Sequence, residues 1–579
     1  MRPIVVLLVL LTCTFVAAAG AITDGSGLAI IQGGQAQAVI VISPNADDQT
    51  RKAANVLSNY LWKSTEARVP VVIDMTAGEG YRILVGESAL LADSQIAVAL
   101  QDLDEQGFLI LCRDDYIAIV GPSVWGTLHG VYDFLERFVG VRWLLPGPDG
   151  EDVPKRRDVV VPRGDIREEP AFSYRTISPI RGSPDSPGAM QWHNEWAQRN
   201  KLQGSYDDRI RFHHNLYSVF PPEKYGQTHC QLYPECKVPG PGQHTGWQPC
   251  FTAKESVDIA VAEIIAYFDA HPYETCFSLG VNDSRGHCEA NPSHPHYPDR
   301  LNSIGMVDMS DIYYAWVNEV VTRVLEVYPD KWFGLLAYAD VMDPPSFPLH
   351  PRVIPFITKD RLAWIDEDVR TAGHRQMDAW NAVAAQVAWY DYMYGGAHYV
   401  VPRIFSHVMA ENFRYAKRNG VVGTYTEMYH TVIDGPKPWL AARLQWNPDQ
   451  DVDALLWEWY ERAVGPAAAH DLKAFYDLWE RFWTVRIKKS PWFARSKGRT
   501  YLLFTDLEYL HLVTDEDINE SKRLLASVVA KAETPQQKTR ARLIQRAFEY
   551  CEASVVSYPR RTSPPQDYLA ALRMLEDVA

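Results

Sequence analysis

Trp332-Phe-Gly-Leu-Leu-Ala-Tyr338, followed by Ala339-Asp340, is the stretch that decides the fold. A short apolar run of this kind is typical of one buried strand, and here the strand ends in an aromatic and an acidic residue. The segment 310–328 before it has the spacing of a helix, with its apolar residues on one face: Ile312, Trp316, Val320 and Val324. A helix that leads into a buried strand is the repeating unit of an α/β protein.

The same unit recurs on both sides of this stretch. Eight strands are predicted, at 172–177, 214–220, 247–251, 276–281, 332–338, 353–357, 387–392 and 421–426. Clear helices are predicted between them at 252–270, 310–328, 366–384 and 408–418. Eight strands that alternate with helices predict an α/β fold with a (β/α)8 TIM-like barrel over residues 166–440. The second and third connections are irregular, which leaves the strand count open by one.

Different patterns flank the predicted barrel. Residues 24–165 combine short strands with two amphipathic helices, at 47–64 and 126–138, and predict a small α/β domain. Its end, from residue 147, is rich in Pro, Gly and charge and predicts a linker. Residues 441–579 carry helical periodicity almost throughout and predict a helical C-terminal domain.

The first residues have the pattern of a secretory signal peptide. Arg2 precedes an apolar run over residues 4–16, and small residues follow it up to Ala21. The run is shorter than the ~20 apolar residues that a membrane span needs. We therefore predict a signal peptide over residues 1–21 and a secreted or periplasmic protein with no transmembrane segment after its removal. An uncleaved N-terminal anchor is the alternative.

The composition narrows the range of partners. Lys and Arg total 57 against 72 Asp and Glu, so the chain carries a formal charge of −15. This charge argues against binding of nucleic acid or of an anionic membrane. Aromatic residues make up 12% of the chain, and tryptophan rings outside periodic segments suit stacking against the flat faces of sugars.

Motifs for other chemistries are missing from the sequence. There is no G-x-S-x-G elbow, no P-loop and no dinucleotide fingerprint, so we predict no cofactor. Five cysteines fall between residues 230 and 288 and suit disulfides in an exported protein, but seven cysteines outside the signal are an odd number and their pairing is left open. A metal cluster is the rival interpretation. No C-x-x-C or H-x-x-x-H pair supports it, and we predict no metal site.

Acidic and aromatic residues gather where the predicted strands end. In a TIM barrel the carboxyl ends of the strands form one rim, and this rim carries the functional residues. Asp283 follows the fourth predicted strand and Glu427 follows the eighth, and we predict that these two are catalytic. Glycoside hydrolysis needs such a pair. One group donates a proton to the leaving oxygen while the other stabilises an oxocarbenium-like transition state.

We predict substrate-binding residues at the same strand ends: Asn282, His214, Asn215, Arg175, Tyr338, Asp340, Trp389, Tyr390 and Asp391. Simpler interpretations compete with several of them. An Asp at a strand end is often a helix cap or a solvated loop residue. Arg175 lies inside a strand and is alternatively a buried salt-bridge partner. Asn282-Asp283-Ser284 before Gly286 is alternatively an Asx-turn without chemistry.

Four segments form a set with a family resemblance: residues 125–147 (WGTLHGVYDFLERFVGVRWLLPG), 170–175, 278–284 and 328–340. Together they resemble glycoside hydrolase family 163, a group related in layout to the family 67 α-glucuronidases and the family 20 hexosaminidases. The resemblance covers roughly residues 30–480. It implies an α/β domain like the one before family 20 barrels, a catalytic barrel, and endo-β-N-acetylglucosaminidase activity on N-glycans. Family members often carry a cysteine-rich loop after the Asn-Asp motif, and here only Cys288 remains, beside His287 and Glu289.

If the substrate carries a 2-acetamido group, the carbonyl oxygen of that group can act as an internal nucleophile. Asn282 and Asp283 would then orient the acetamido group and Glu427 would be the acid/base, or Asp283 and Glu427 would exchange roles. The pocket would be lined by Tyr338, Asp340, Tyr390 and Asp391.

Two other functions stay open. One is an α-glucuronidase-like exo-glycosidase, whose uronate substrate would need a cationic clamp such as Arg175, Lys359 and Arg361. The other is a non-catalytic carbohydrate-binding protein that kept the barrel. In all three cases the partner is an oligosaccharide or a glycoprotein glycan.

Overall fold

The computed structural model describes residues 27–73, 80–179, 188–203 and 210–558, and the predicted signal peptide lies outside them. The chain forms two compact units. The first comprises residues up to Val141 together with Val153–Glu169, and the second comprises Arg142–Asp152 and the chain from Pro170 onward. The C-terminal helices therefore belong to the same unit as the strands predicted to form the barrel.

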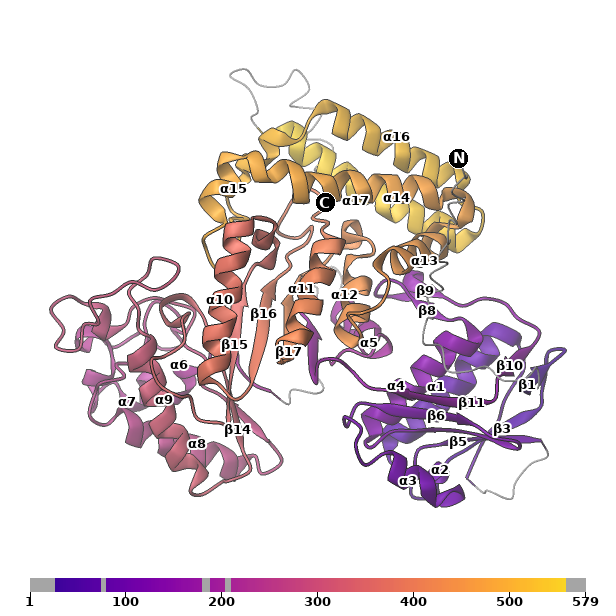
Figure 1. Ribbon diagram of the computed structural model, residues 1–579, viewed down its shortest axis with the longest axis horizontal. Coiled ribbons are helices and arrows are strands. Elements are labelled where there is room, and N and C mark those ends of the chain that lie inside the picture. Colours follow the sequence, from indigo (N-terminus) through magenta and orange to yellow (C-terminus); the bar gives the residue numbers. More distant parts are fainter. Residues whose placement is uncertain (1–26, 74–79, 180–187, 204–209, 559–579) are drawn as a thin grey trace, which may run out of the picture. The chain divides into compact units, whose positions relative to one another are not determined.

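The first unit is mixed α/β, as predicted, and is built on a six-stranded sheet in the order β11-β6-β7-β5-β3-β4 (Figure 1). The strands are β3 (Ala38–Val41), β4 (Val71–Val72), β5 (Tyr81–Val85), β6 (Phe108–Cys112), β7 (Tyr116–Val120) and β11 (Gly164–Glu168). A smaller sheet contains β1 (Leu28–Gln32), β2 (Gln35–Ala36) and β10 (Val159–Val161). The helices are α1 (Asp48–Thr65), α2 (Glu87–Ala92), α3 (Ser94–Ala99) and α4 (Val124–Phe134). Asp47 and Ser123 begin α1 and α4, because the side chain of each accepts N–H groups of the first turn.

The second unit contains a parallel sheet of six strands, in the order β12-β17-β16-β15-β14-β13. They are β12 (Tyr174–Ile177), β13 (Cys276–Ser278), β14 (Trp332–Ala337), β15 (Val353–Lys359), β16 (Val387–Tyr392) and β17 (Val421–Glu427). The helices between them are α5 (Ala189–Arg199), α7 (Pro222–Tyr225), α8 (Ser256–Ala270), α9 (Ser310–Leu325), α10 (Glu367–Val383) and α11 (Ser406–Arg418). Every residue of β16 is buried, which is why these strands read as continuous apolar runs. Six of the eight predicted strands are confirmed.

The predicted TIM barrel does not close, because the other two predicted strands do not form. Residues 214–220 contain the short helix α6 (Leu216–Val219), and residues 247–251 have no regular secondary structure. Pro221, Pro222 and Pro249 lie in or next to these segments, and proline cannot donate to a strand ladder. The sheet is a curled half-barrel with β12 and β13 at its edges.

Phe212 fills the interior of this half-barrel. Its ring stacks on Phe356 of β15 at a centroid distance of 3.6 Å, and it meets Tyr174, Tyr390 and Tyr425 edge-on at 5.9, 6.1 and 5.4 Å. Gly334 of β14 permits the close approach of this segment, since a Cβ there would lie 2.4 Å from the Arg211 carbonyl oxygen. A single parallel bridge between His214 and Gly280 is all that remains of the predicted second strand.

The C-terminal region is helical, as predicted. It consists of α12 (Lys437–Trp446), α13 (Val452–Val464), α14 (Pro466–Arg481), α15 (Pro491–Ser496), α16 (Asp515–Lys531) and α17 (Pro535–Ser557). Thr514 and Thr534 begin the last two helices with capping boxes. The segment after α15 returns to the sheet, where the Asp360 N–H donates to the Thr500 carbonyl oxygen at 2.8 Å. A short hairpin, β8 (Arg142–Trp143) with β9 (Glu151–Asp152), completes the unit.

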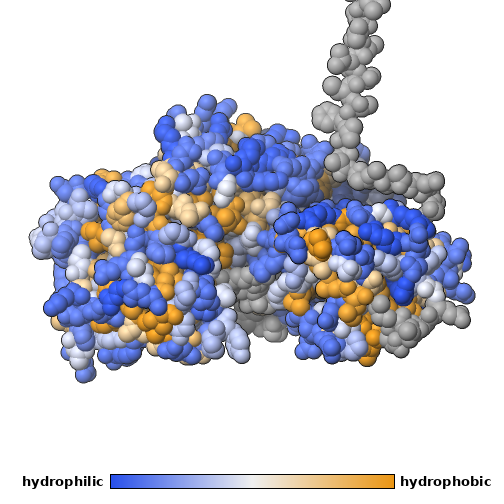
Figure 2. Space-filling model, turned by 60° about the horizontal axis from the view of Figure 1, so that its bottom comes forward, coloured by the Kyte–Doolittle hydropathy of each residue, from blue (hydrophilic) through white to orange (hydrophobic). Residues whose placement is uncertain are grey.

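The surface is mainly hydrophilic on the face drawn in Figure 2, where hydrophobic residues form small groups between polar ones. Among the described helices, none combines the length and the apolar character that crossing a bilayer requires. Most large apolar side chains are in the interior, as in other globular proteins.

Candidate active site

Asp283 lies in the loop after β13, at the carboxyl ends of the parallel strands. Its side chain is 60% exposed, and its Oδ1 accepts a hydrogen bond of 3.2 Å from the Tyr338 hydroxyl. Nε2 of His214 lies 3.8 Å from the same oxygen, while Nδ1 of His214 contacts the Val281 carbonyl oxygen. Oδ2 of Asp283 has no partner among the described residues, so it is available to a ligand.

A buried glutamine holds the backbone on both sides of Asp283. Oε1 of Gln248 accepts a hydrogen bond of 3.0 Å from the Asn282 N–H, and its Nε2 donates to the carbonyl oxygens of Asn282 (2.7 Å) and Ser284 (2.8 Å). The Asn282 side chain is buried too, and it donates to the Trp247 carbonyl oxygen at 3.2 Å. The irregular segment 247–251 therefore fixes the loop that carries Asp283.

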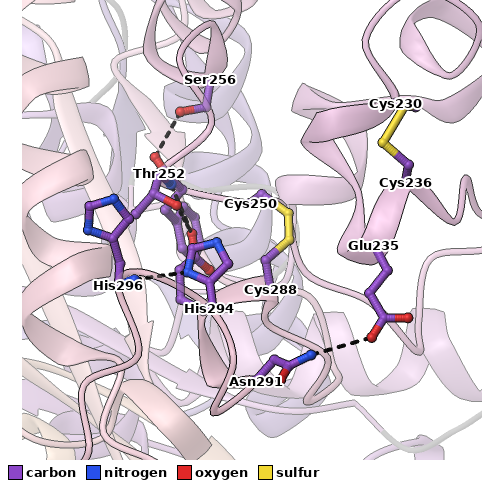
Figure 3. The surroundings of a disulfide bond; sticks show 12 residues. Cys230, Glu235, Cys236, Cys250, Thr252, Ser256, Cys288, Asn291, His294 and His296 are labelled. Atoms are coloured by element: carbon purple, nitrogen blue, oxygen red, sulfur yellow. Dashed lines mark hydrogen bonds between the residues drawn. A yellow bond between two sulfur atoms is a disulfide. The ribbon is translucent and has the colours of Figure 1, made fainter.

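A disulfide joins the same two segments. Figure 3 shows the bond between Cys250 and Cys288, and next to it Thr252 donates to Oε1 of Glu289 from its N–H (2.8 Å) and its hydroxyl (2.9 Å). A second disulfide connects Cys230 with Cys236. These two bonds settle the pairing that the sequence leaves open for four of the cysteines. In residues 27–73, 80–179, 188–203 and 210–558, no group of three or more His, Cys, Asp or Glu is arranged to hold a metal ion.

Glu427 ends β17 inside a cluster of tyrosines. It is 9% exposed, and its Oε2 accepts a hydrogen bond of 2.9 Å from the Tyr394 hydroxyl. Tyr390 of β16 also hydrogen-bonds to Glu427. Burial, followed by the charges of Tyr338 and Glu427, raises the pKa of Tyr392 well above its usual range. The hydroxyls around Glu427 therefore stay protonated and act as hydrogen-bond donors.

Tyr338 connects the two carboxyl groups. Burial raises the pKa of its hydroxyl, and the charges of Asp283 and Glu427 raise it further. Tyr338 donates to Asp283, and the charge of Glu427 also acts on its hydroxyl, so both candidate catalytic residues lie near the hollow beside Tyr338. The ring of His214 meets the ring of Tyr338 at 5.6 Å and closes one side.

Buried ion pairs hold the tyrosine cluster from behind. Arg403 binds Asp360 through two hydrogen bonds of 2.7 and 2.6 Å, and both side chains are fully buried. Arg403 also donates to the carbonyl oxygens of Tyr392 (3.0 Å) and Tyr394 (3.3 Å). Nζ of Lys437 adds a bond of 3.3 Å to the Tyr394 carbonyl oxygen. The backbone under Tyr392 and Tyr394 is thus fixed by charged groups in the protein interior.

A cavity of about 650 Å³ opens beside Asp283 and Tyr338. Its other wall is formed by α15 and the segment after it, which contribute Arg495, Arg499 and Tyr501. The ring of Tyr501 lies 5.1 Å from that of Tyr392, so the cavity adjoins the tyrosine cluster around Glu427. The volume is in the usual range for a small-molecule site.

The structure brings five predicted site residues to this hollow: Asp283, Glu427, His214, Tyr338 and Tyr390. The structure corrects the prediction for two residues of β16, Trp389 and Asp391. Successive side chains of a strand point to opposite faces, so these two side chains face away from Tyr390. The Arg361 guanidinium lies 3.7 Å over the Trp389 ring, and the Arg361 N–H donates to Asp391 at 3.1 Å. Burial raises the pKa of Asp391 to about 6, against the opposing charge of Arg361. Both residues belong to the core.

Two polar residues predicted to bind substrate instead shape the loops. Asn282 is buried, and its side chain is used by the backbone of neighbouring segments, including the Tyr217 N–H at 2.7 Å. Asn215 donates to the Ser278 carbonyl oxygen at 2.9 Å and accepts from the Ser218 hydroxyl at 2.7 Å. The full burial of Asn282 corrects the prediction for this residue, whereas the half-buried Asn215 keeps one amide N–H and its role stays a prediction.

Two charged residues predicted to bind substrate are also buried. Arg175 donates to the carbonyl oxygens of Phe172 (2.6 Å) and Lys201 (2.8 Å) and packs on the Trp446 ring at 5.0 Å. Asp340 is 6% exposed, and burial raises its pKa to about 6. Its Oδ2 lies 3.9 Å from Nε2 of the buried His287. These positions correct the predictions for Arg175 and Asp340.

Several residues of the site are missing from the predictions. Tyr392 and Tyr394 follow Tyr390 at intervals of two residues, so the period of a strand would have placed them on the same face. Tyr501 and Gln248 lie in irregular segments, and no sequence pattern connects them with Asp283 or Glu427.

A family model described as "Domain of unknown function (DUF4838)" matches residues 145–477, which is more than half of the chain. The chain belongs to this family. The matched residues contain the half-barrel and both candidate catalytic residues, while membership of glycoside hydrolase family 163 stays a prediction. No curated protein matches the chain.

A solved structure of a glycoside hydrolase has a similar fold. A family GH115 4-O-methyl-α-glucuronidase with specificity for decorated arabinogalactans has a TM-score of 0.59 at 15% sequence identity, over 95% of this chain and 76% of that one. A GH20 β-N-acetylhexosaminidase from Streptomyces coelicolor A3(2) has a TM-score of 0.43 at 13% identity, over 76% of this chain and 92% of that one. The first likeness shows a shared fold, and the second is too weak to add to it.

Proposed function

We propose that the protein is a glycoside hydrolase in which Asp283 and Glu427 act on the same glycosidic bond. The observation that carries this proposal is that Tyr338 donates to Asp283 and also lies within the electrostatic influence of Glu427, beside a cavity next to a tyrosine cluster. Hydrolysis needs a proton for the leaving oxygen and negative charge near the anomeric carbon. The fold shared with a GH115 enzyme supports the proposal.

The surroundings of the two acids assign their roles. Glu427 accepts a hydrogen bond from Tyr394, and its carboxylate serves as the negative charge that stabilises the oxocarbenium-like transition state. Asp283 is exposed and keeps Oδ2 open, so it is placed to pass a proton to the leaving oxygen. Of the two assignments that the sequence allows, the structure favours this one.

For the substrate we propose a glycan that contains N-acetylglucosamine, cleaved by endo-β-N-acetylglucosaminidase chemistry with help from the 2-acetamido group. The motifs that resemble family 163 support this choice. The tyrosine rings provide apolar faces for the acetyl methyl group, and the Glu427 carboxylate would accept the acetamido N–H. Asn282 takes no part, because its side chain is buried.

The cationic clamp predicted for an α-glucuronidase is not available to a substrate. Arg175 and Arg361 are fully buried, and Nζ of Lys359 donates to the Arg499 carbonyl oxygen at 2.6 Å. An exo-acting α-glucuronidase remains the second candidate on the strength of the GH115 likeness, with other residues as its clamp.

We infer that the protein works outside the cytoplasm, as a secreted or periplasmic enzyme. The disulfides Cys230–Cys236 and Cys250–Cys288 support this inference, because such bonds persist in oxidising compartments. The signal-like N-terminus supports it as well.

Digestion of glycoproteins and free glycans, read by mass spectrometry, tests the proposed function. The wild type should release oligosaccharides, and Asp283→Asn and Glu427→Gln should each abolish most of the release. Glu319→Gln, on α9 and away from the hollow, is the matched control. Full release by both site variants would reject the assignment. Binding to a glycan array without hydrolysis, unchanged by either substitution, would favour a non-catalytic carbohydrate-binding protein.

A further inference from the structure

We propose that the cavity beside Asp283 binds an anionic group of the substrate, a carboxylate or a sulfate, through Arg285 and Arg499. This inference rests on the proposed glycosidase function and narrows its substrate class to acidic glycans. The negative charge would lie on a sugar adjoining the cleaved bond, because the cavity adjoins both Asp283 and Tyr338.

The charges that line the cavity do not balance. Arginine contributes three side chains, Arg285, Arg495 and Arg499, and Asp283 is the one acid among the described residues that line it. Arg495 is neutralised, because it pairs with Asp506 at 2.8 Å and with Glu508. Within the described part of the chain, no carboxylate lies within ion-pair distance of Arg285 or Arg499. In a chain with 72 acids against 57 bases, two uncompensated arginines on one cavity point to a ligand.

Asp340, an acid on which the charge of Arg285 acts, cannot take the place of that ligand. Asp340 lies behind the cavity wall with 6% exposure, and its carboxyl faces the buried His287 at 3.9 Å. The charge of Arg285 acts on Asp340 only from a distance, without an ion pair. Arg285 is exposed, and so is Arg499. Nε of Arg499 donates to the Arg495 carbonyl oxygen at 3.4 Å, and the other guanidinium donors of the two residues are open to a ligand.

Both arginines stand on backbone that is fixed before a ligand arrives. The residues on either side of Arg285 are held by Gln248, whose Nε2 donates to the Ser284 carbonyl oxygen at 2.8 Å and whose N–H donates to the Gly286 carbonyl oxygen at 3.1 Å. The Arg499 carbonyl oxygen accepts from Nζ of Lys359 at 2.6 Å. Binding of a ligand then costs little conformational entropy of the backbone.

The chemistry of guanidinium selects the ligand class. Its planar set of N–H donors matches the paired oxygens of a carboxylate or a sulfate, and such bonds are stronger than those to neutral hydroxyls. Asp283, which lines the same cavity, offers an anion no positive charge. The anion is thereby directed to the arginines, and the sugar that carries it is oriented relative to Asp283.

The test is a glycan array of three matched sets: uronate-bearing oligosaccharides, sulfated oligosaccharides, and the same chains after carboxyl reduction or desulfation. Binding is measured in the Glu427→Gln background, which keeps bound glycans intact. We expect at least one acidic set to bind about tenfold or more tightly than its neutral counterpart, as charged hydrogen bonds imply. Arg285→Gln and Arg499→Gln should remove this preference, whereas Arg323→Gln, exposed on α9, should preserve it.

Each outcome decides the question. Preference for uronates identifies a carboxylate as the ligand, and preference for sulfated chains identifies a sulfate. Equal binding of acidic and neutral glycans, no binding of any acidic glycan, or a preference that survives both arginine substitutions would overturn the inference. Hydrolysis is assayed separately in the wild type, so a protein that binds acidic glycans without cleaving them would reject only the proposed glycosidase function.

Discussion

The two proposed catalytic carboxyl groups are held in different ways. Glu427 stands at the end of a parallel strand, among tyrosines whose backbone is fixed by buried ion pairs. Asp283 stands on an irregular loop that a buried glutamine, the Asn282 side chain and a disulfide attach to a second irregular segment. The position of Glu427 thus follows from the sheet itself, whereas the position of Asp283 depends on a few specific contacts between loops.

The largest effect on turnover should come from removing the charge of Glu427, the carboxyl group at the end of a strand. Glu427→Gln keeps the shape of the side chain and an oxygen that accepts from Tyr394, so the fold should be retained while turnover falls about 10³-fold or more. Release of oligosaccharide measures the turnover, and circular dichroism checks the fold. Turnover within a few-fold of the wild type would show that Glu427 does not take part in the reaction.

The stability of the protein should depend on the disulfide that supports the loop of Asp283. Replacing Cys250 and Cys288 together by Ser opens a loop with a sequence separation of 38, against 6 for Cys230 and Cys236. Loop-closure entropy then predicts losses of about 4 and about 2 kcal/mol in the free energy of unfolding. Urea unfolding measures both losses.

Only the replacement of Cys250 and Cys288 should also reduce turnover, by about tenfold or more, because their disulfide supports the loop of Asp283. The pair Cys230 and Cys236 serves as the matched control. Equal turnover of the two double variants would mean that the disulfide does not position Asp283.

The ion pair behind the tyrosines should matter for stability. Arg403→Gln leaves the Asp360 carboxylate buried without its partner, and we expect a loss of about 3 kcal/mol in the free energy of unfolding. Arg323→Gln breaks an exposed pair with Asp258 and should cost less than about 1 kcal/mol. Comparable losses in urea unfolding would contradict the role given to the buried pair.

A smaller, pH-dependent effect is expected at Asp340. Burial raises its pKa in the folded protein from 3.8 to about 6. The unfolded state therefore releases this proton at lower pH, and the wild type loses stability as the pH rises from about 4 to about 6. Asp340→Asn removes this loss, so it should be more stable than the wild type by about 2 kcal/mol at pH 7, with the difference shrinking towards pH 4. A difference that does not change with pH would contradict this.

The sequence predicts the parallel strands of the second unit much better than its irregular segments. Six buried apolar runs become the six parallel strands, because a strand buried on both faces needs such a run. Residues 214–220 and 247–251 look similar in sequence, yet their backbone groups bond to side chains and to distant loops. Periodicity cannot separate these cases, since the deciding partners are far away in the chain.

The same division holds for the site. Asp283, Glu427, Tyr338 and Tyr390 are found from strand ends alone. The predictions for Trp389 and Asp391 are wrong because these residues alternate with Tyr390 along β16 and face the core, whereas the same alternation places Tyr392 on the face of Tyr390. Gln248, Arg285, Arg499 and Tyr501 reach the site through tertiary contacts of irregular segments, and no local pattern marks them.

The most direct test of joint action by the two carboxyl groups is a double-mutant cycle on turnover, with Asp283→Asn, Glu427→Gln and the double variant assayed on one glycan. Residues that act on one transition state lose their effects together, so the double variant should be no slower than the slower single variant. If the losses of the two single variants multiply in the double variant, or if either single variant keeps full turnover, Asp283 and Glu427 do not work on the same bond.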